Sequence, residues 1–480
     1  MDELAYLSAT EALARFRSKE LSPKELLDGL ITRIEGVNDD VNAIADRLFE
    51  EARGLATKAT ERYVSQPDDV RPLEGLPIAA KAEQPIAGRV WSDGSLAYAE
   101  RTADKTHPVL ERVTAAGGII HMRTTTPEFS CAAFTHSKLW GVTRNPWNLL
   151  YSPGGSSGGS GAALAAGMAP LATGSDIGGS IRIPAAFCGV VGFKPPHGRV
   201  PDLPPFNLDP YCHVGPMART VADCALLQNV IAGPHPLDAH SLRPLVTVST
   251  ESVDIAEMRI GLAVNLGDWA IEPEVEANTR AAADALREAG AVVEEIVIGV
   301  SRAEVDRATV AHFSTIFGHA IAEEVAKHGD LLTPYVSDFA ERFRAKGSGD
   351  TFLEGMELEA AIYAKVAPHL ERHEALICPT AGFPALLAGE DYIDSGMTVA
   401  GADVDPMRDS IMTLAFNILG NCPVLAVPSG WAANGVPTGV QIVGRTFDDA
   451  TVFRVGAALE AVRPWGYGDL GRHPDFSFAT

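Results

Sequence analysis

The first sixty residues repeat apolar positions every three or four residues, which is the period of an α-helix. The stretch LSATEALARFRSKELSPKELLDGLITRIEGV, from Leu7 to Val37, shows this pattern most clearly. Ser22 and Pro23 divide it, because a serine followed by a proline is typical of a helix cap and its first turn. We therefore expect a helical segment over about residues 1–65.

Short apolar runs bounded by glycine or proline come next, and such runs indicate buried strands. One is GLPIAAK, which ends at Lys81, and another is ALICPT at 375–380. The segment HPVLERVTAAGGIIHMRT predicts a helix, a glycine stop and a strand. Further expected elements are a strand, helix and strand over 258–298, a charged outer helical layer over 300–375, a hairpin around 431–435 and a last helix at 448–462.

Strands that alternate with helices favour an α/β class of fold. A chain of 480 residues is long enough for two domains, although one large unit is equally open. No internal repeat is visible, and the segments 201–216 and 232–246, rich in proline and glycine, indicate loops rather than linkers.

Charge narrows the choice of partners. The formal net charge is −23, and no basic run relieves it. Because phosphate backbones bind basic surfaces, we expect no nucleic-acid partner.

Cysteine spacing and apolar runs narrow the choice of compartment. None of the six cysteines forms a C-x-x-C pair, so neither a zinc site nor a disulfide framework is expected. The acidic start MDELAY is unlike a secretory signal. Two uncharged stretches, 145–175 and 410–444, are interrupted by glycine and proline, whereas a membrane helix needs about 20 apolar residues. We expect a cytoplasmic protein that does not enter the membrane.

A glycine- and serine-rich stretch from Ser152 to Pro184 holds the candidate chemistry. No lysine lies between Lys138 and Lys194, so the phosphate-loop motif fails, and a dinucleotide fingerprint fails because position 164 is leucine. Residues 154–158, GGSSG, match the G-x-S-x-G nucleophile elbow. With His197 or His213 as the base, a conventional Ser–His triad stays open.

A second cluster, GSDIGGSIR at 174–182, places two glycines directly before Ser180. Glycines allow successive N–H groups to face one point, which suits the binding of an oxyanion. The alternative is that Gly178 and Gly179 only permit tight packing.

The two clusters together resemble the amidase signature family. GGSSGGS at 154–160 is followed by GSDIGGSIRIPAAFCGVVGFKP at 174–195, and GLPIAAK, GVTRNPWN, GPMARTVAD and GVPTGVQIVG resemble its other blocks. The resemblance implies one domain over 1–480, with a signature core at about 73–225. It further implies a mixed, twisted sheet covered by helices on both faces, and no metal or cofactor.

The same resemblance implies a Ser–Ser–Lys triad. Ser180 is then the nucleophile, Ser156 the bridging serine after a cis bond from Gly155, and Lys81 the base. A lysine accepts a proton only when neutral, and the apolar flank LPIAA is consistent with burial that favours the neutral amine. The expected oxyanion donors are the backbone N–H groups of Ile177, Gly178, Gly179 and Ser180.

Other residues have supporting parts in this interpretation. Ser157 and Ser175 are candidates for orienting the triad, and Asp176 and Arg182 for an ion pair across the nucleophile turn. The family usually has aspartate directly after its lysine, whereas this chain has Ala82 and then Glu83. Candidate substrate-binding residues are Ser130 and Phe129, then Ile177, Ile181 and Ile183, and more loosely Tyr211, Cys212, His213 and Trp269.

We therefore expect an amidase that hydrolyses an apolar or aryl amide, an anilide or a carbamate (urethane) through an acyl-enzyme. The alternative is the catalytic component (the A chain) of a glutamine-dependent tRNA amidotransferase. Those catalytic components usually carry threonine at the position of Ile177 and glutamine at that of Ile183, so the apolar pair favours the first function. A homodimer is one expected state, because dimers are common among relatives of this family.

Overall fold

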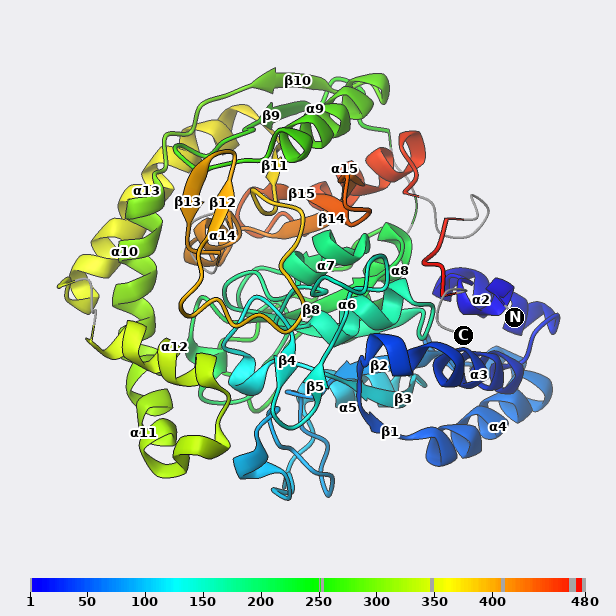
Figure 1. Cartoon of the computed structure of the whole chain (residues 1–480). Coiled ribbons are helices and arrows are strands. Elements are labelled where there is room, and N and C mark those ends of the chain that lie inside the picture. The colour runs from blue at the N-terminus through cyan, green and yellow to red at the C-terminus, as the bar shows by residue number, and fades with distance from the viewer. Residues whose placement is uncertain are drawn as a thin grey trace.

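A mixed sheet of eleven strands runs through the computed structural model of the chain (Figure 1), which describes residues 2–249, 251, 254–345, 349–406, 411–465 and 472–476. Strands β2, β3 and β6 pair in parallel, as do β9, β10 and β11, while the central strands pair antiparallel. In spatial order the strands are β1 (Ile44–Arg47), β3 (Ile119–Thr124), β2 (Pro77–Lys81), β6 (Leu171–Asp176), β8 (His213–Ala218), β7 (Val191–Lys194), β14 (Val424–Trp431), β15 (Pro437–Gly444), β11 (Ala375–Pro379), β9 (Arg259–Leu262) and β10 (Val292–Glu295).

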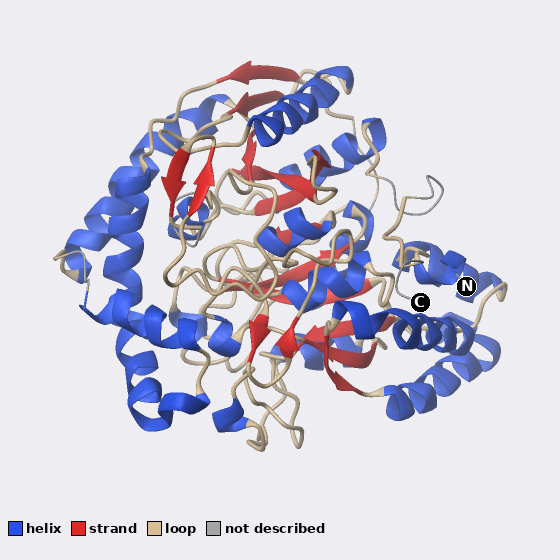
Figure 2. Ribbon diagram, in the orientation of Figure 1, coloured by secondary structure: helices blue, strands red, loops and turns tan. Residues whose placement is uncertain are grey.

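Helices flank this sheet (Figure 2). They are α1 (Asp2–Ala5), α2 (Ala9–Ser18), α3 (Pro23–Val41), α4 (Phe49–Ser65), α5 (Pro108–Ala115), α6 (Gly158–Ala165), α7 (Arg182–Cys188), α8 (Val221–Ile231), α9 (Pro273–Glu288), α10 (Arg302–Phe313), α11 (His319–His328), α12 (Pro334–Ala345), α13 (Phe352–Arg372), α14 (Leu414–Ile418) and α15 (Asp449–Val462). Two small ribbons stand outside the main sheet, β4 (His136–Ser137) with β5 (Gly141–Val142), and β12 (Met397–Val399) with β13 (Ala402–Val404).

Both faces of the sheet are buried, which explains the unbroken apolar runs of its strands. In β2, Ile78 and Ala80 belong to the core on one face and Ala79 to the core on the other. The same alternation occurs in β14, where Leu425 and Ala426 point to opposite cores. The predicted class of fold, one large α/β domain with helices on both faces of a mixed sheet, is confirmed.

Several predicted elements lie where the sequence placed them. Helix α3 begins with a capping box in which Ser22 and Glu25 exchange hydrogen bonds, with Pro23 in the first turn. Strand β2 ends at Lys81, β14 and β15 form the expected hairpin, and α15 is the expected last helix.

Two expectations need correction. Strand β1, at the edge of the sheet, interrupts the N-terminal helices, and its half-exposed residues IADR carry little apolar pattern. The segment 201–216 is a loop only as far as Cys212, because β8 begins at His213 and its polar first residue is buried against β6.

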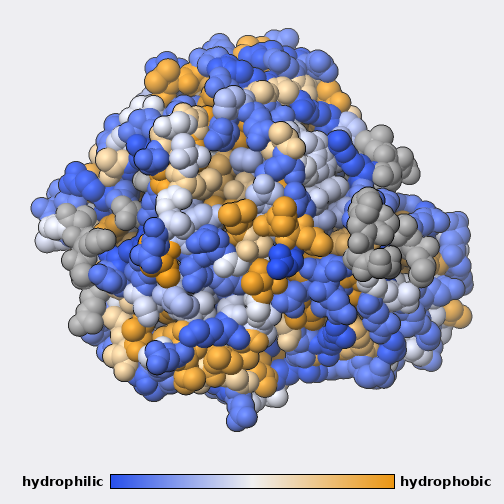
Figure 3. Space-filling model, viewed as in Figure 1, coloured by the Kyte–Doolittle hydropathy of each residue, from blue (hydrophilic) through white to orange (hydrophobic). Residues whose placement is uncertain are grey.

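The outer helices α10 to α13 curve along one side of the molecule in Figure 1, as their charged helical pattern predicted. Figure 3 shows a largely hydrophilic face on which apolar residues gather in separate patches. Within the described residues, no helix is both long and apolar enough to cross a membrane.

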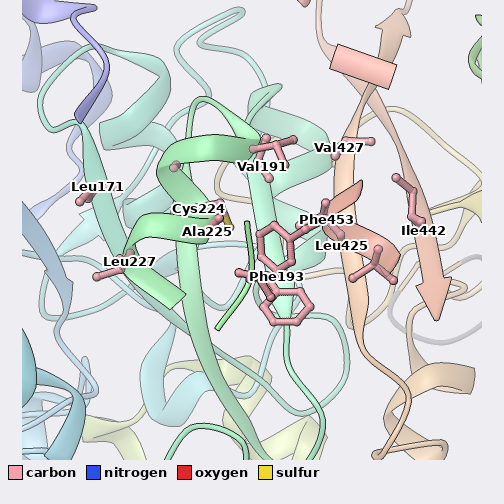
Figure 4. Packing of buried hydrophobic residues seen from close by; sticks show 14 of the residues in the cluster. Leu171, Val191, Phe193, Cys224, Ala225, Leu227, Leu425, Val427, Ile442 and Phe453 are labelled. Atoms are coloured by element: carbon pink, nitrogen blue, oxygen red, sulfur yellow. The ribbon is translucent and has the colours of Figure 1, made fainter. Parts of the chain in front are cut away.

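The largest core joins the middle of the sheet to α8 and α15. Phe193 of β7 and Phe453 of α15 meet edge to face at its centre, with ring centroids 4.7 Å apart (Figure 4). This is a preferred geometry for two aromatic rings.

We expect Phe453→Ala to lower the free energy of unfolding by about 3–5 kcal/mol, because it leaves a cavity against Phe193. The side chain of Phe453 is only 2% exposed. The measurement is the shift of the guanidinium chloride midpoint. Val297→Ala, at a side chain 82% exposed, is the control and should change stability by less than about 0.5 kcal/mol. Equal shifts for both variants would contradict this account of the core.

Candidate active site

A cavity of about 430 Å³ opens above the ends of β2 and β6, and we call it the cleft. Its inner end carries Ser156, Ser175 and Ser180. Its other walls come from the segments 83–93, 129–134 and 202–214 and from the outer helices. The glycine–serine stretch and the charged outer layer, far apart in the sequence, therefore enclose one space.

Lys81 lies directly behind this inner end and has no exposed surface. Its Nζ donates hydrogen bonds to Ser156 Oγ and to Ser175 Oγ, both at 2.7 Å. Lys81 is the last residue of β2, and Ser175 lies near the end of the adjacent parallel strand β6. Parallel pairing thus brings the two residues to the same edge of the sheet.

Ser156 precedes α6 in a tightly packed turn. The Gly155–Ser156 peptide bond is cis, as the family resemblance implied. A Cβ on residue 155 would lie 2.3 Å from the carbonyl oxygen of Phe134, so only glycine fits there. This close approach accounts for the glycine directly before Ser156.

Ser180 lies in the turn between β6 and α7, and its side chain lines the cleft. Its carbonyl oxygen accepts a hydrogen bond from the N–H of Ser157 at 3.1 Å, which ties the two serine clusters together. Among the hydrogen bonds of the described residues, none joins the hydroxyls of Ser156 and Ser180 directly.

A buried ion pair holds the turn that carries Ser180, as predicted for Asp176 and Arg182. Both side chains have no exposed surface, and two bonds of 2.9 Å join them. Burial raises the pKa of Asp176, but the charge of Arg182 and hydrogen bonds from Arg182 and Asn417 outweigh it and lower the pKa below its usual value. Arg182 also donates to Gln441 Oε1 at 2.7 Å.

The carboxylate of Asp176 also occupies one of the expected oxyanion donors. The N–H of Gly179 donates to Asp176 Oδ1 at 2.8 Å. Gly179 has φ +119°, which favours glycine, and a Cβ there would lie 2.1 Å from Thr413 Oγ1. Within the described residues the N–H groups of Ile177, Gly178 and Ser180 have no such partner, so the structure leaves three donors rather than four.

Glu83 is a residue of the site to which the sequence analysis assigned no role. Its Oε2 lies 2.5 Å from Lys81 Nζ and accepts hydrogen bonds from Ser175 Oγ at 2.7 Å and Ser130 Oγ at 3.1 Å. Burial raises the pKa of Glu83, but the charge of Lys81 and these hydrogen bonds outweigh it, so the pKa is lowered. One sequence signal could have indicated a role for Glu83. It is the carboxylate two residues after Lys81, in a chain where Ala82 stands at the position of the family's usual aspartate.

Ser157 contacts the main chain of Ser175 rather than Lys81. Its Oγ accepts from the N–H of Ser175 at 3.3 Å and donates to the carbonyl of Ser175 at 3.4 Å. It therefore braces the strand that carries Ser175, whereas Ser175 itself touches Lys81.

Lys194 and His213 form a second buried pair beneath the turn that carries Ser180. Lys194 Nζ lies 3.4 Å from His213 Nε2 and donates to the carbonyl of Cys422 at 2.9 Å. Burial, followed by the charge of Arg182, lowers the pKa of Lys194 to about 7. Burial and then Lys194 lower the pKa of His213 well below its usual value, so this ring is neutral. Its Nδ1 faces the carbonyl of Asp176 at 3.1 Å.

These contacts argue against a conventional Ser–His triad. The ring of His213 is engaged by main-chain carbonyls and Lys194, and that of His197 by the carbonyl of Cys212 and by His240. The partner that the structure gives to the Ser156 hydroxyl is Lys81.

The structure shows which of the candidate pocket residues line the cleft and which do not. Six of them line the cleft: Phe129, Ser130, Ile177, Ile183, Cys212 and His213. Three do not, and these assignments are corrected. Ile181 packs in the core against Gly174 and Gly192, Tyr211 stacks on His312 at 3.8 Å, and Trp269 is buried among residues of the outer layer.

The described residues contain no group of three or more His, Cys, Asp or Glu side chains placed to hold a metal ion.

Comparisons with known proteins find relatives over nearly the whole chain. A family model described as Amidase matches residues 25–453. The chain is 34% identical over 474 residues to an acylamidase of Rhodococcus erythropolis, and the match covers 96% of each chain. It is also 34% identical over 492 residues to the A component of the glutamyl-tRNA(Gln) amidotransferase of Roseiflexus sp. (strain RS-1), covering 97% of each. Among solved structures, a bacterial aryl acylamidase of the amidase signature enzymes has a TM-score of 0.88 at 28% identity, covering 96% of this chain and 97% of that one.

We expect Lys194→Met to remove a pH dependence of stability. The pKa of Lys194 is about 7 in the folded chain, below its ordinary value of 10.5. Between these values the unfolded chain binds more protons, so this residue makes the free energy of unfolding rise as the pH rises from about 7 towards 10.

The measurement is the difference in unfolding free energy between wild type and Lys194→Met from pH 6.5 to 9.5. This difference should increase with pH. The exposed Lys58→Met is the control and should follow wild type. A constant difference would mean that Lys194 keeps its proton in the folded chain throughout this range.

Proposed function

We propose that this chain, which belongs to the amidase family, cleaves its substrate through an acyl-enzyme on Ser180, with Ser156 and Lys81 moving the proton. That it hydrolyses amides follows from its family and from its acylamidase relatives. The observation that carries the proposed triad is the 2.7 Å contact between Lys81 Nζ and Ser156 Oγ beside Ser180. In this proposal the two serines line the cleft and the amine of Lys81 lies behind Ser156.

In the first half-reaction Ser180 Oγ attacks the amide carbon while its proton passes to Ser156 and the proton of Ser156 passes to Lys81. The C–N bond then breaks, and the leaving nitrogen takes a proton back from Ser156, which Lys81 replenishes. In the second half-reaction water attacks the acyl carbon by the same relay and releases Ser180. The proposed relay requires the two hydroxyls to meet when substrate is bound, since catalytic contacts often tighten only in the complex.

The oxyanion is stabilised by backbone N–H groups in this proposal. The three donors without a partner, at Ile177, Gly178 and Ser180, are assigned to it. Gly179 supports them differently, because Asp176 holds its N–H and thereby sets the direction of the neighbouring peptides. Removing one such donor costs about 10²–10³ in rate in comparable sites.

The surrounding residues are proposed as positioning residues. Ser175 holds Lys81 Nζ in line with Ser156, and Ser157 fixes the main chain of Ser175. Asp176 and Arg182 keep the turn of the nucleophile in one shape.

An apolar or aryl amide, anilide or carbamate is the proposed substrate class. Phe129, Ile177 and Ile183 line the cleft and support it, since apolar walls bind apolar groups. The relative that belongs to a tRNA amidotransferase represents the alternative function. A glutamine side chain would leave its polar amide against Ile177 and Ile183, so the cleft supports the hydrolase of apolar amides.

The cellular location and the binding partners of the enzyme are part of the same proposal. Six free cysteines support a reducing, cytoplasmic location, and the net charge of −23 supports the absence of a nucleic-acid partner. A homodimer stays a prediction, for which light scattering on the purified chain is the measurement.

We expect wild type to release p-nitroaniline from p-nitroanilides and p-nitrophenol from p-nitrophenyl carbamates, and Ser180→Ala to lose this activity by at least about 10³-fold. Ser156→Ala and Lys81→Met should lose it to a similar degree, because they break the same relay. Ser65→Ala, at an exposed serine of α4, is the control and should match wild type. Full activity of folded Ser180→Ala would contradict the assignment of the nucleophile.

We expect Glu83→Ala to lower kcat/KM by about 10²-fold, because Glu83 Oε2 lies against Lys81 Nζ and accepts from Ser175 and Ser130, so its loss releases Lys81 from its place beside Ser156. Glu83→Gln keeps an acceptor oxygen and should retain more activity than Glu83→Ala. Asp391→Asn is the control, because it removes a charge of the same cleft that pairs with His136 instead. Wild-type activity of folded Glu83→Ala would show that Glu83 does not position Lys81.

A further inference from the structure

We propose that the outer end of the cleft is a second binding site for the substrate, which takes an uncharged ring with a hydrogen-bonding group next to it. We call it the distal subsite and define it by Phe206, Thr309, Phe313, Phe317, Phe339 and Phe343, all of which line the cleft. The proposal rests on the proposed function, because it assigns a further part of the same substrate.

The five phenylalanines come from four elements of the chain. Phe313 ends α10, Phe317 lies in a wide π-helical turn at Ser314–Gly318, and Phe339 and Phe343 lie one turn apart on α12. Phe206 reaches them from the loop before β8. The chain thus gathers aromatic side chains from positions more than a hundred residues apart.

The rings contact one another and leave one face to the cavity. Phe206 stacks on Phe317 with centroids 5.2 Å apart, and Phe313 packs against Phe317 at 5.5 Å and Phe343 at 5.3 Å. Phe206 is 42% exposed although it belongs to this aromatic group. An exposed ring at the entrance of an apolar cavity is placed to stack on an incoming ring.

The size of the cleft supports an occupant larger than a single ring. An apolar cavity of about 150 Å³ is enough to hold benzene. The cleft measures about 430 Å³, close to three times as much. A one-ring amide at Ser180 would therefore leave the distal subsite empty.

Thr309 is the polar residue of the distal subsite. It lies on the cleft face of α10, one turn before Phe313, and only 4% of it is exposed. Its Oγ1 has no hydrogen-bond partner within the described residues and is itself covered, just beneath the surface of the cleft. Because a buried hydroxyl without a partner is costly, a substrate atom that bonds to Oγ1, once the side chain turns toward the cleft, gains affinity.

The charges at the rim are already paired, which disfavours an ionic substrate group. Arg342 donates to Asp338 at 2.5 Å and also to Asp405. Asp306 likewise has a partner. An apolar chamber with one hydroxyl, whose rim groups already have partners, favours a neutral ring beside a carbonyl or similar acceptor.

The test compares p-nitroanilides of three acids: benzoic, 4-benzylbenzoic and 4-benzoylbenzoic. The last two acids have two rings each and differ only in CH₂ against C=O between them. We call a substrate one-ring or two-ring by the part that is varied, since the constant part adds the same further ring to every substrate. A parallel series keeps the benzoyl group and varies the amine among aniline, 4-benzylaniline and 4-aminobenzophenone, with the product amine measured by chromatography. In one of the two series we expect the two-ring substrates to exceed the one-ring substrate by at least about 10-fold in kcat/KM. In that series the ketone should exceed its CH₂ counterpart by a further factor of roughly 3 to 10.

Two variants test which residues produce these increases in kcat/KM. Phe317→Ala should remove most of the two-ring gain and change the one-ring substrate by less than about 2-fold. Thr309→Val keeps the shape of the side chain and should remove the ketone gain alone. Phe352→Ala is the control, because Phe352 is also 42% exposed but lies outside the cleft.

The outcomes separate this proposal from the proposed function. Equal rates for one- and two-ring substrates in both series, or equal losses for all substrates in Phe317→Ala, would overturn the distal subsite. If no amide is turned over, calorimetry of the same amides with Ser180→Ala still tests the subsite, since tighter binding of the two-ring amides supports it and equal binding overturns it. Failure of turnover alone would count against the proposed triad.

Discussion

The buried ion pair of Asp176 and Arg182 is the interaction on which the inner end of the cleft depends. Neither side chain has exposed surface, so the pair is stable only because its remaining polar atoms are also bonded. Asp176 accepts from Gly179 and Asn417, and Arg182 donates to Gln441. These bonds connect β6, the nucleophile turn, α14 and β15. Loss of either charge would leave the other buried and unpaired, and the turn that carries Ser180 would lose its shape.

The parallel pairing of β2 and β6 supplies the other half of the arrangement. It sets Lys81 and Ser175 side by side, and Ser156 completes the contact from a turn that only Gly155 allows. Lys81 is thus held by hydroxyls and by the carboxylate of Glu83, and its own side chain has no exposed surface. The amine of Lys81 that the proposed relay needs and the carboxylate of Glu83 that pairs with it therefore lie within one hydrogen-bonded group.

Local pattern alone favoured an α/β fold, because strands, caps and glycine turns leave signals within a few residues. The resemblance to the amidase family implied the rest, namely one domain with a mixed sheet and the parts proposed for Lys81, Ser156 and Ser180. The walls of the cleft were predicted less well. Ile181, Tyr211 and Trp269 were expected in the pocket and lie elsewhere, since the direction of a side chain depends on packing partners from distant segments. Glu83 and Thr309 carry no motif, and their importance follows from contacts with residues far along the chain or from the lack of such contacts.

The π-helical turn at Ser314–Gly318 makes the arrangement of the outer layer sensitive to the gain or loss of a single residue. Such a turn holds one more residue than a regular helical turn, and it can arise by a single insertion. Loss of one residue there would rotate α11 by about 100° relative to α10 and carry Ile321 away from the cleft. The lining of the outer cleft can therefore be changed by one codon while β2, β6 and the serine turns stay as they are. The part of the protein that meets variable substrates is in this way genetically separable from the part that carries the chemistry.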